Sequence, residues 1–157
     1  MRNMTREKKI VASIEIECFA HATESKEKVL EALFNLAPQE LRTLLKEKIS
    51  HFTLRGYHGN PIVLYKLKLE KEFAQQMIKY IFSKMEDFDL KLMSSSLKER
   101  SDKASFYFRL DKQHAYLGIF RVLQGDDVIK IKVNFLPHIR GIEKIKDALS
   151  ALGLKIE

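Results

Sequence analysis

The sequence predicts an α+β protein in which a single antiparallel β-sheet has helices packed on one face. Segments with two-residue alternation, typical of strands, are interspersed with segments whose apolar residues recur at helical spacing. Several expected strands are joined by short turn-forming loops, which connect antiparallel neighbours. The predicted order is β-α-(α)-β-β-α-β-β-β-α. Since no Gly/Ser linker or repeat interrupts the chain, we expect one domain over residues 1–157, with residues 1–8 as a flexible basic N-terminus.

The first elements are expected to be a strand and two helical pieces. Residues 9–19 alternate between apolar and polar positions, as in a strand with one buried face; Ile10, Ile14 and Ile16 lie on one face. Thr23 and Ser25 are N-cap candidates for a helix, which Pro38 interrupts. A second helical piece begins near that proline, where a missing N–H does no harm.

A hairpin and a helix follow. Residues 52–55 and 62–69 are strand-like, and the turn-rich segment 56–61 between them predicts a β-hairpin. Residues 71–85 then carry apolar side chains at a period close to 3.6, which predicts a helix. The next residues, 86–103, are charged and serine-rich and are expected to form a short helix or an irregular link.

The last third of the chain predicts more strands and a closing helix. We expect a strand over residues 105–110 and a turn over residues 111–118. A second hairpin is expected to pair residues 119–123 with 128–135. The final helix should bury Ile142, Ile145, Ala148, Leu149 and Leu152 and end at Gly153.

The composition favours a polyanionic partner. The chain has 28 Lys and Arg against 21 Asp and Glu, a formal charge of +7 and a pI near 9.4. Such a balance suits nucleic acid, although a soluble basic protein without such a partner remains an alternative. The single cysteine, Cys18, precludes an internal disulfide and fits a reducing cytosol. No stretch approaches the roughly 20 apolar residues that span a bilayer, so we expect a cytoplasmic protein without membrane contact.

Motifs for catalysis or cofactor binding are missing from the sequence. The five histidines have no metal-ligand spacing, and one cysteine cannot build a thiolate site. There is no glycine-rich nucleotide loop and no nucleophile elbow. We therefore expect no metal, no cofactor and no enzyme. The minority alternative is a ribonuclease that uses His58 or His114 as an acid–base group.

Strand alternation places basic side chains on the sheet face opposite the helices. Lysine and arginine there would neutralise phosphates, Tyr107 would stack on a base, and Asn134 would read a base edge or a 2′-OH. Two alternatives stay open, because Glu15, Glu17 and Asp111 would share this face as salt-bridge partners, and the face would equally suit a homodimer. The predicted face comprises Lys66, Lys68, Tyr107, Arg109, Lys130, Lys132 and Asn134. Further basic residues at its rim include Lys98, Arg100 and Lys103 in the link and Lys144 in the last helix.

Five segments in order resemble a known family. They are residues 19–24 (FAHATE), 27–33 (EKVLEAL), 56–62 (GYHGNPI), 106–118 (FYFRLDKQHAYLG) and 125–129 (GDDVI). This ordered set is similar to the archaeal exosome-subunit-like RNA-binding proteins. The resemblance implies a fold similar to the ribosomal protein that binds five-S ribosomal RNA, and a role in RNA processing or ribosome assembly. It also implies that the matching motif positions are surface candidates: His58, Gly59, Asn60, Arg109, Asp111, Lys112 and Gln113.

The leading hypothesis is a non-catalytic RNA-binding protein. Its partners would be structured or ribosomal RNA, with a homodimer or an RNA-processing complex as further partners. Phosphates would be gripped by Lys66, Lys68, Arg109, Lys112, Lys130 and Lys132, with Tyr107, Gln113, Asn134, His58 and Asn60 completing the site. The first alternative is a structural or assembly protein that uses the open sheet face for a homodimer or for docking on another protein.

Overall fold

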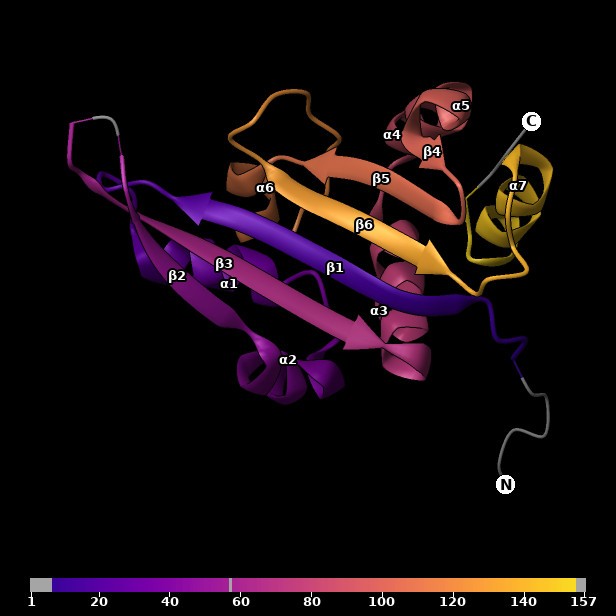
Figure 1. Cartoon of the computed structure of the whole chain (residues 1–157), viewed down its shortest axis with the longest axis horizontal. Coiled ribbons are helices and arrows are strands. Elements are labelled where there is room, and N and C mark those ends of the chain that lie inside the picture. The colour runs from indigo at the N-terminus through magenta and orange to yellow at the C-terminus, as the bar shows by residue number, and fades with distance from the viewer. Residues whose placement is uncertain (1–6, 57, 155–157) are drawn as a thin grey trace.

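A computed structural model of the chain describes residues 7–56 and 58–154, so most of the predicted basic N-terminus lies outside the described residues. The described chain forms one six-stranded antiparallel sheet in the order β2-β3-β1-β6-β5-β4 (Figure 1). The strands are β1 (Val11–Ala20), β2 (Ser50–Arg55), β3 (Pro61–Glu70), β4 (Ser101–Asp102), β5 (Ser105–Leu110) and β6 (Ile129–Phe135).

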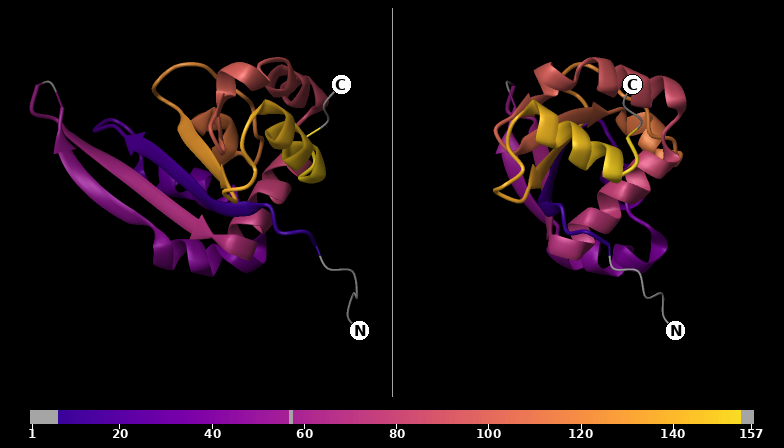
Figure 2. Two further views of the ribbon diagram at one scale, coloured as in Figure 1. Left: turned by 45° about the vertical axis from the view of Figure 1, so that its right-hand side comes forward. Right: turned by 90° about the vertical axis from the view of Figure 1, so that its right-hand side faces the viewer.

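The helices leave one sheet face open. In Figure 1 the helices α1, α3 and α6 lie behind the sheet, and α4, α5 and α7 gather beside β4 and β5 (Figures 1 and 2). The helices are α1 (Lys26–Phe34), α2 (Arg42–Lys48), α3 (Lys71–Lys84), α4 (Asp87–Ser95), α5 (Leu97–Arg100), α6 (Lys112–Tyr116) and α7 (Ile142–Ala151), with a 3-10 turn η1 (Gln39–Leu41) before α2. This confirms the predicted fold class. None of the helices within residues 7–56 and 58–154 has the length and continuous apolar surface of a transmembrane span.

The core lies between the sheet and the helices, as strand alternation requires. Ile14 and Ile16 of β1 are buried, as are Phe106 and Phe108 of β5, whose rings pack 6.0 Å apart between centroids. Cys18 belongs to this core, and burial raises the pKa of its thiol to about 12, so it is an apolar filler rather than a reactive thiolate.

Near its start β1 departs from simple alternation. A bulge between Val11 and Ser13 turns Val11 inward, although the alternation had predicted an outward position. The buried Gln75 of α3 satisfies the backbone there, because its Oε1 accepts the N–H groups of Ile10 and Val11 at 2.8 and 3.0 Å. One side-chain amide therefore fixes the irregular start of the strand to a helix.

Three local predictions for the last third differ from the structure. Residues 119–123 form no strand, and only a single bridge joins Val122 to Leu110. The reason is the buried Asp89, whose carboxylate accepts the Val122 N–H at 3.1 Å and the Arg121 Nε–H at 2.9 Å, so this segment is held on α4. Strand β6 pairs directly with β5 rather than in a hairpin with residues 119–123.

The predicted turn at residues 111–118 contains the helix α6. Its Ala115 is fully buried, and α6 packs against α1. Asn35 Nδ2 donates to the carbonyls of Ala115 and Tyr116 at 3.0 and 3.1 Å, which satisfies groups that a helix end leaves free. In the final helix, Ile142 is exposed rather than inward, while Ile145, Ala148, Leu149 and Leu152 are buried as expected.

Candidate nucleic-acid interface

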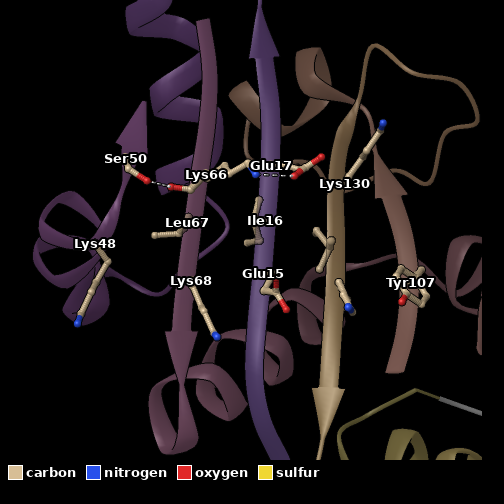
Figure 3. Close-up of a pocket in the computed structure, with 12 residues that line it drawn as sticks. Glu15, Ile16, Glu17, Lys48, Ser50, Lys66, Leu67, Lys68, Tyr107 and Lys130 are labelled. Atoms are coloured by element: carbon tan, nitrogen blue, oxygen red, sulfur yellow. Dashed lines mark hydrogen bonds and ion pairs between the residues drawn. The ribbon is translucent and has the colours of Figure 1, made fainter. Parts of the chain in front are cut away.

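A shallow groove of about 480 Å³ lies on the open sheet face and contains most of its charged side chains. Figure 3 shows the lining side chains on β3, β1, β6 and β5, with Lys48 at the margin of the groove, at the end of α2. Its floor is formed by Ile16, Leu67 and Ile131. The polar and aromatic lining consists of Glu15, Glu17, Lys48, Ser50, Lys66, Lys68, Tyr107, Lys130 and Lys132. Five lysines therefore face two glutamates in one depression.

Strand register arranges these charges in alternating rows. Glu15 stands between Lys68 on β3 and Lys132 on β6. Glu17 stands in the same way between Lys66 and Lys130, and Lys66 Nζ lies 4.0 Å from Glu17 Oε2. This is the arrangement that the salt-bridged alternative requires, although an exposed pair at this distance contributes little to stability. The lysine excess leaves the groove positive.

Aromatic rings accompany the lysines. Lys132 Nζ lies 5.6 Å from the centroid of the Tyr107 ring, which is 39% exposed. Lys66 Nζ lies 6.0 Å from the centroid of Phe52, which is 49% exposed. Each pair combines a cation with a flat apolar face, as sites that bind phosphate and base together do.

Sequence reasoning missed Phe52 and Lys48 as parts of this surface. Ser50 pairs with Lys66 and Phe52 with Leu64 in the hairpin, so Phe52 faces the same side as the groove lysines. Alternation along residues 50–54 carried this information, but only together with the hairpin register. Lys48 ends α2, and its position beside β3 is a tertiary feature.

Asn134, predicted to read a base, is already fully engaged. Its Nδ2 donates to Ser13 Oγ at 2.9 Å and to Glu15 Oε2 at 2.6 Å, while its Oδ1 accepts from Ser105 Oγ at 2.8 Å. Asn134 therefore links β1, β6 and β5 across the open face. Its amide is occupied in positioning Glu15 rather than free for a ligand.

Lys112 is the clearest departure from the predicted surface. Its side chain is only 6% exposed, and Nζ donates to the Phe19 carbonyl at 2.9 Å and to Glu24 Oε1 at 2.9 Å. It also lies 2.5 Å from Asp127 Oδ1. All donors of the ammonium group thus have protein acceptors, and Lys112 fixes α6 to β1, to the turn before α1 and to the loop before β6.

The pKa shifts reflect this network. Burial lowers the pKa of Lys112, but the hydrogen bonds to Asp127 and Glu24 outweigh it, and the net pKa is raised above 10.5. Burial raises the pKa of Asp127, whereas its hydrogen bond to Lys112 and the charge of Lys112 lower it to a net value below 3.8. Both groups are therefore held in their charged forms at neutral pH.

The same cluster has metal-like ligands. His21, Glu24 and Asp127 each offer a ligand atom, all within 4.8 Å of one another. The Lys112 ammonium already supplies a positive charge to both carboxylates, and His21 Nε2 lies 3.2 Å from Asp127 Oδ1. The cluster therefore serves as an ion-pair network that joins three segments.

The remaining predicted residues lie away from the groove. His58 and Asn60 belong to the hairpin loop beside His21, where Gly56 N–H donates to the Asn60 carbonyl at 2.7 Å and Gly59 has a φ of +78°. This conformation explains the glycine, since side chains disfavour it. Gln113 lies with Glu24 near the start of α1. These residues and Lys112 are thus not brought together with Lys66, Lys68, Lys130 and Lys132.

Arg109 lies at the edge of the open face and is tied to the loop before β6. Its Nη1 donates to the Gly125 carbonyl at 2.5 Å and lies 3.8 Å from Asp126 Oδ1. His114, the ribonuclease alternative, is paired through Nδ1 with Asp111, three residues earlier. That contact orients the ring on the first turn of α6, outside the groove.

Comparison with known proteins gives consistent matches along most of the chain. An uncharacterized protein from Methanocaldococcus jannaschii is 37% identical over 127 residues, covering 78% of this chain and 83% of that protein. An RNA-binding protein from Pyrococcus abyssi is 35% identical over 123 residues, covering 77% and 79%.

Solved structures agree with these matches. A DUF54 protein from Archaeoglobus fulgidus has a TM-score of 0.74 at 26% identity, covering 90% of this chain and 99% of that chain. A DUF54 protein from Sulfolobus solfataricus has a TM-score of 0.69 at 26% identity, covering 88% and 98%. The model of the RNA_binding family, described as RNA binding, matches residues 13–135, more than half of the chain. The chain therefore belongs to this RNA-binding family.

Proposed function

We propose that the protein is a non-catalytic, cytoplasmic RNA-binding protein that holds RNA in the groove of its open sheet face. The observation that carries the proposal is the gathering of five lysines and Tyr107 in one depression that no helix covers. Lysine ammonium groups neutralise phosphates without reading sequence, so recognition would depend on backbone and shape. Membership of the RNA-binding family supports the same partner.

The proposed contacts differ from those expected from sequence. Lys48, Lys66, Lys68, Lys130 and Lys132 would bind phosphates, and Tyr107 and Phe52 would stack on bases. Lys112 is left out because its ammonium is buried. As a biological setting we propose RNA processing or ribosome assembly on structured or ribosomal RNA, in keeping with the resemblance to exosome-subunit-like proteins and to the five-S-binding ribosomal protein.

RNA affinity should depend steeply on salt. With five phosphates neutralised, the dissociation constant for single-stranded RNA is expected to rise about a hundredfold between about 50 and 200 mM salt, because each contact releases counterions. Fluorescence anisotropy with labelled RNA measures this slope, and gel analysis of the same RNA checks that it stays intact. A flat salt response would contradict phosphate binding, and cleavage of the RNA would contradict the non-catalytic assignment.

The glutamates of the groove provide a test in which RNA affinity should rise rather than fall. Glu17→Gln removes a negative charge beside Lys66 and Lys130, so RNA affinity is expected to rise about threefold while the free energy of unfolding changes by less than about 1 kcal/mol. Binding and urea denaturation measure the two effects. The matched control is Glu31→Gln on α1, at an exposed position outside the groove. Unchanged affinity with lowered stability would instead favour the purely salt-bridged surface.

An assembly role is the second candidate, and the far end of the open face supports it. Phe52 and Leu54 of the edge strand β2 are 49% and 45% exposed and stand on the same face as Leu64. Exposed apolar side chains on an unpaired strand edge are typical of protein contacts. Light scattering of the protein without RNA tests this role, which predicts a dimer that Phe52→Ser with Leu54→Ser converts to a monomer.

A further inference from the structure

A second basic pocket lies next to the groove, at the edge of β5. It measures about 480 Å³. Helix α5 and the end of α4 form one side, and residues 123–124, which precede the loop to β6, form the other. Its lining consists of Ser96, Glu99, Arg100, Tyr107, Phe108, Arg109, Leu123 and Gln124. Tyr107 lines both the groove and this pocket, so the two depressions meet at its ring.

Two guanidinium groups line this pocket. Arg100 Nε donates to Ser96 Oγ at 2.6 Å, which leaves its two terminal nitrogens for another acceptor. Arg109 Nη1 donates a hydrogen bond to the Gly125 carbonyl, which fixes the plane of its guanidinium group. In the part of the chain that the structure describes, no carboxylate lies within ion-pair distance of Arg100.

The like charges disfavour each other. Burial lowers the pKa of Arg100, and the nearby positive charge of Arg109 lowers it further, with Glu99 acting in the opposite direction. Their hydrogen bonds go to neutral oxygen acceptors, Ser96 Oγ and the Gly125 carbonyl, and the carboxylate at 3.8 Å from Arg109 belongs to the exposed Asp126. An anion between them would relieve the repulsion, and guanidinium forks match phosphate geometry better than a lysine does.

We propose that Arg100 and Arg109 bind one phosphate of a single-stranded RNA segment that runs from the groove past Tyr107 into this pocket. The proposal rests on RNA binding in the groove and specifies its substrate class. The Tyr107 ring at the junction can stack only on a base that is unpaired, whereas the bases of a duplex are stacked on one another. Leu123, which is exposed at the pocket wall, offers an apolar surface to the neighbouring sugar or base.

The test compares four variants in binding to labelled oligouridine. Arg100→Ala is expected to weaken binding about tenfold and to reduce the salt slope by about 0.7, as loss of one phosphate contact on a single strand does. Arg100→Lys should recover only part of the affinity, because it keeps the charge but loses the fork. Lys98→Ala, an exposed residue of α5 that does not line the pocket, should change affinity less than twofold. The double variant Lys130→Ala with Lys132→Ala measures the contribution of the groove to RNA affinity.

The outcomes separate the two proposals. If the groove variant weakens binding while Arg100→Ala behaves like Lys98→Ala, the pocket proposal is overturned and groove binding stands. If neither variant weakens binding, both are overturned. A duplex of the same length should bind the parent, Arg100→Ala and Lys98→Ala with equal affinity, and a tenfold loss for the duplex with Arg100→Ala would contradict a single-strand pocket. Inorganic phosphate at constant ionic strength should not displace the oligonucleotide, because a free phosphate replaces only the contact with Arg100 and Arg109 and leaves the groove contacts in place. Full displacement would assign the pocket to the free anion.

Discussion

Lys112→Met is expected to lower the free energy of unfolding by about 2–3 kcal/mol. Methionine keeps the unbranched stem but leaves the Phe19 carbonyl, Glu24 and Asp127 without their shared donor. Removing one partner of a buried pair costs about 3–5 kcal/mol. We place the effect below that range because Asp127 is 62% exposed and regains water. Urea denaturation measures the difference, and Lys91→Met on the surface of α4 is the control, expected within about 0.5 kcal/mol of the parent.

The pH dependence of this difference has a defined sign. Asp127 has a lowered pKa, so its contribution is present above pH 3.8 and is lost as the pH falls through the folded-state value below it. Lys112 has a raised pKa, so its contribution is present below pH 10.5 and is lost as the pH rises through the folded-state value above it. The difference in the free energy of unfolding between the parent and Lys112→Met should therefore be largest between these two pH limits and should become smaller in acid. If Lys112→Met were fully stable yet weakened RNA binding, Lys112 would be a phosphate ligand, as the sequence had predicted.

Lys130→Ala with Lys132→Ala is expected to weaken RNA binding about 30-fold. Each ammonium contributes roughly 1 kcal/mol through a charge-assisted contact with phosphate, and two such losses give this factor. The salt slope for a single strand should fall by about 1.4 as two phosphate contacts disappear. Anisotropy titrations at several salt concentrations measure both quantities.

The control for this pair carries the same change of net charge. Lys26 and Lys91 are exposed on α1 and α4, outside the groove, and their double replacement by alanine should change affinity less than threefold. Equal losses for the two double variants would mean that RNA responds only to overall charge. In that case the groove would have no special role, and the assembly function of the open face would be favoured.

Local signals account for most of the fold that could be predicted. The hairpin follows from turn residues between two alternating segments, and α3 from a strict helical period, both of which act over a few residues. Residues 119–123 are also rich in strand-forming side chains, yet the Val122 N–H is bound by Asp89, more than 30 residues away. No local pattern reveals such a competing acceptor.

In the candidate site, too, local patterns predicted some features, and distant residues determined the others. Alternation placed Lys66, Lys68, Tyr107, Lys130 and Lys132 on one face because strand direction alone decides it. Whether a polar residue on that face or in a motif is free depends on its partners. Asn134 and Lys112 look exposed in sequence, but their acceptors come from distant segments. Phe52 became visible only when the strand register was known, and Arg100, expected at the rim of the face, was placed in a pocket with Arg109 only by helix packing.

The position of β1 in the middle of the sheet has a consequence for synthesis of the chain. Its partner β3 follows within 60 residues, but its other partner, β6, begins only at Ile129. During translation one edge of the most apolar strand therefore lacks a neighbour until nearly the whole polypeptide has left the ribosome. A chain that stops before Ile129 retains that open edge, which is a template for association with other nascent chains.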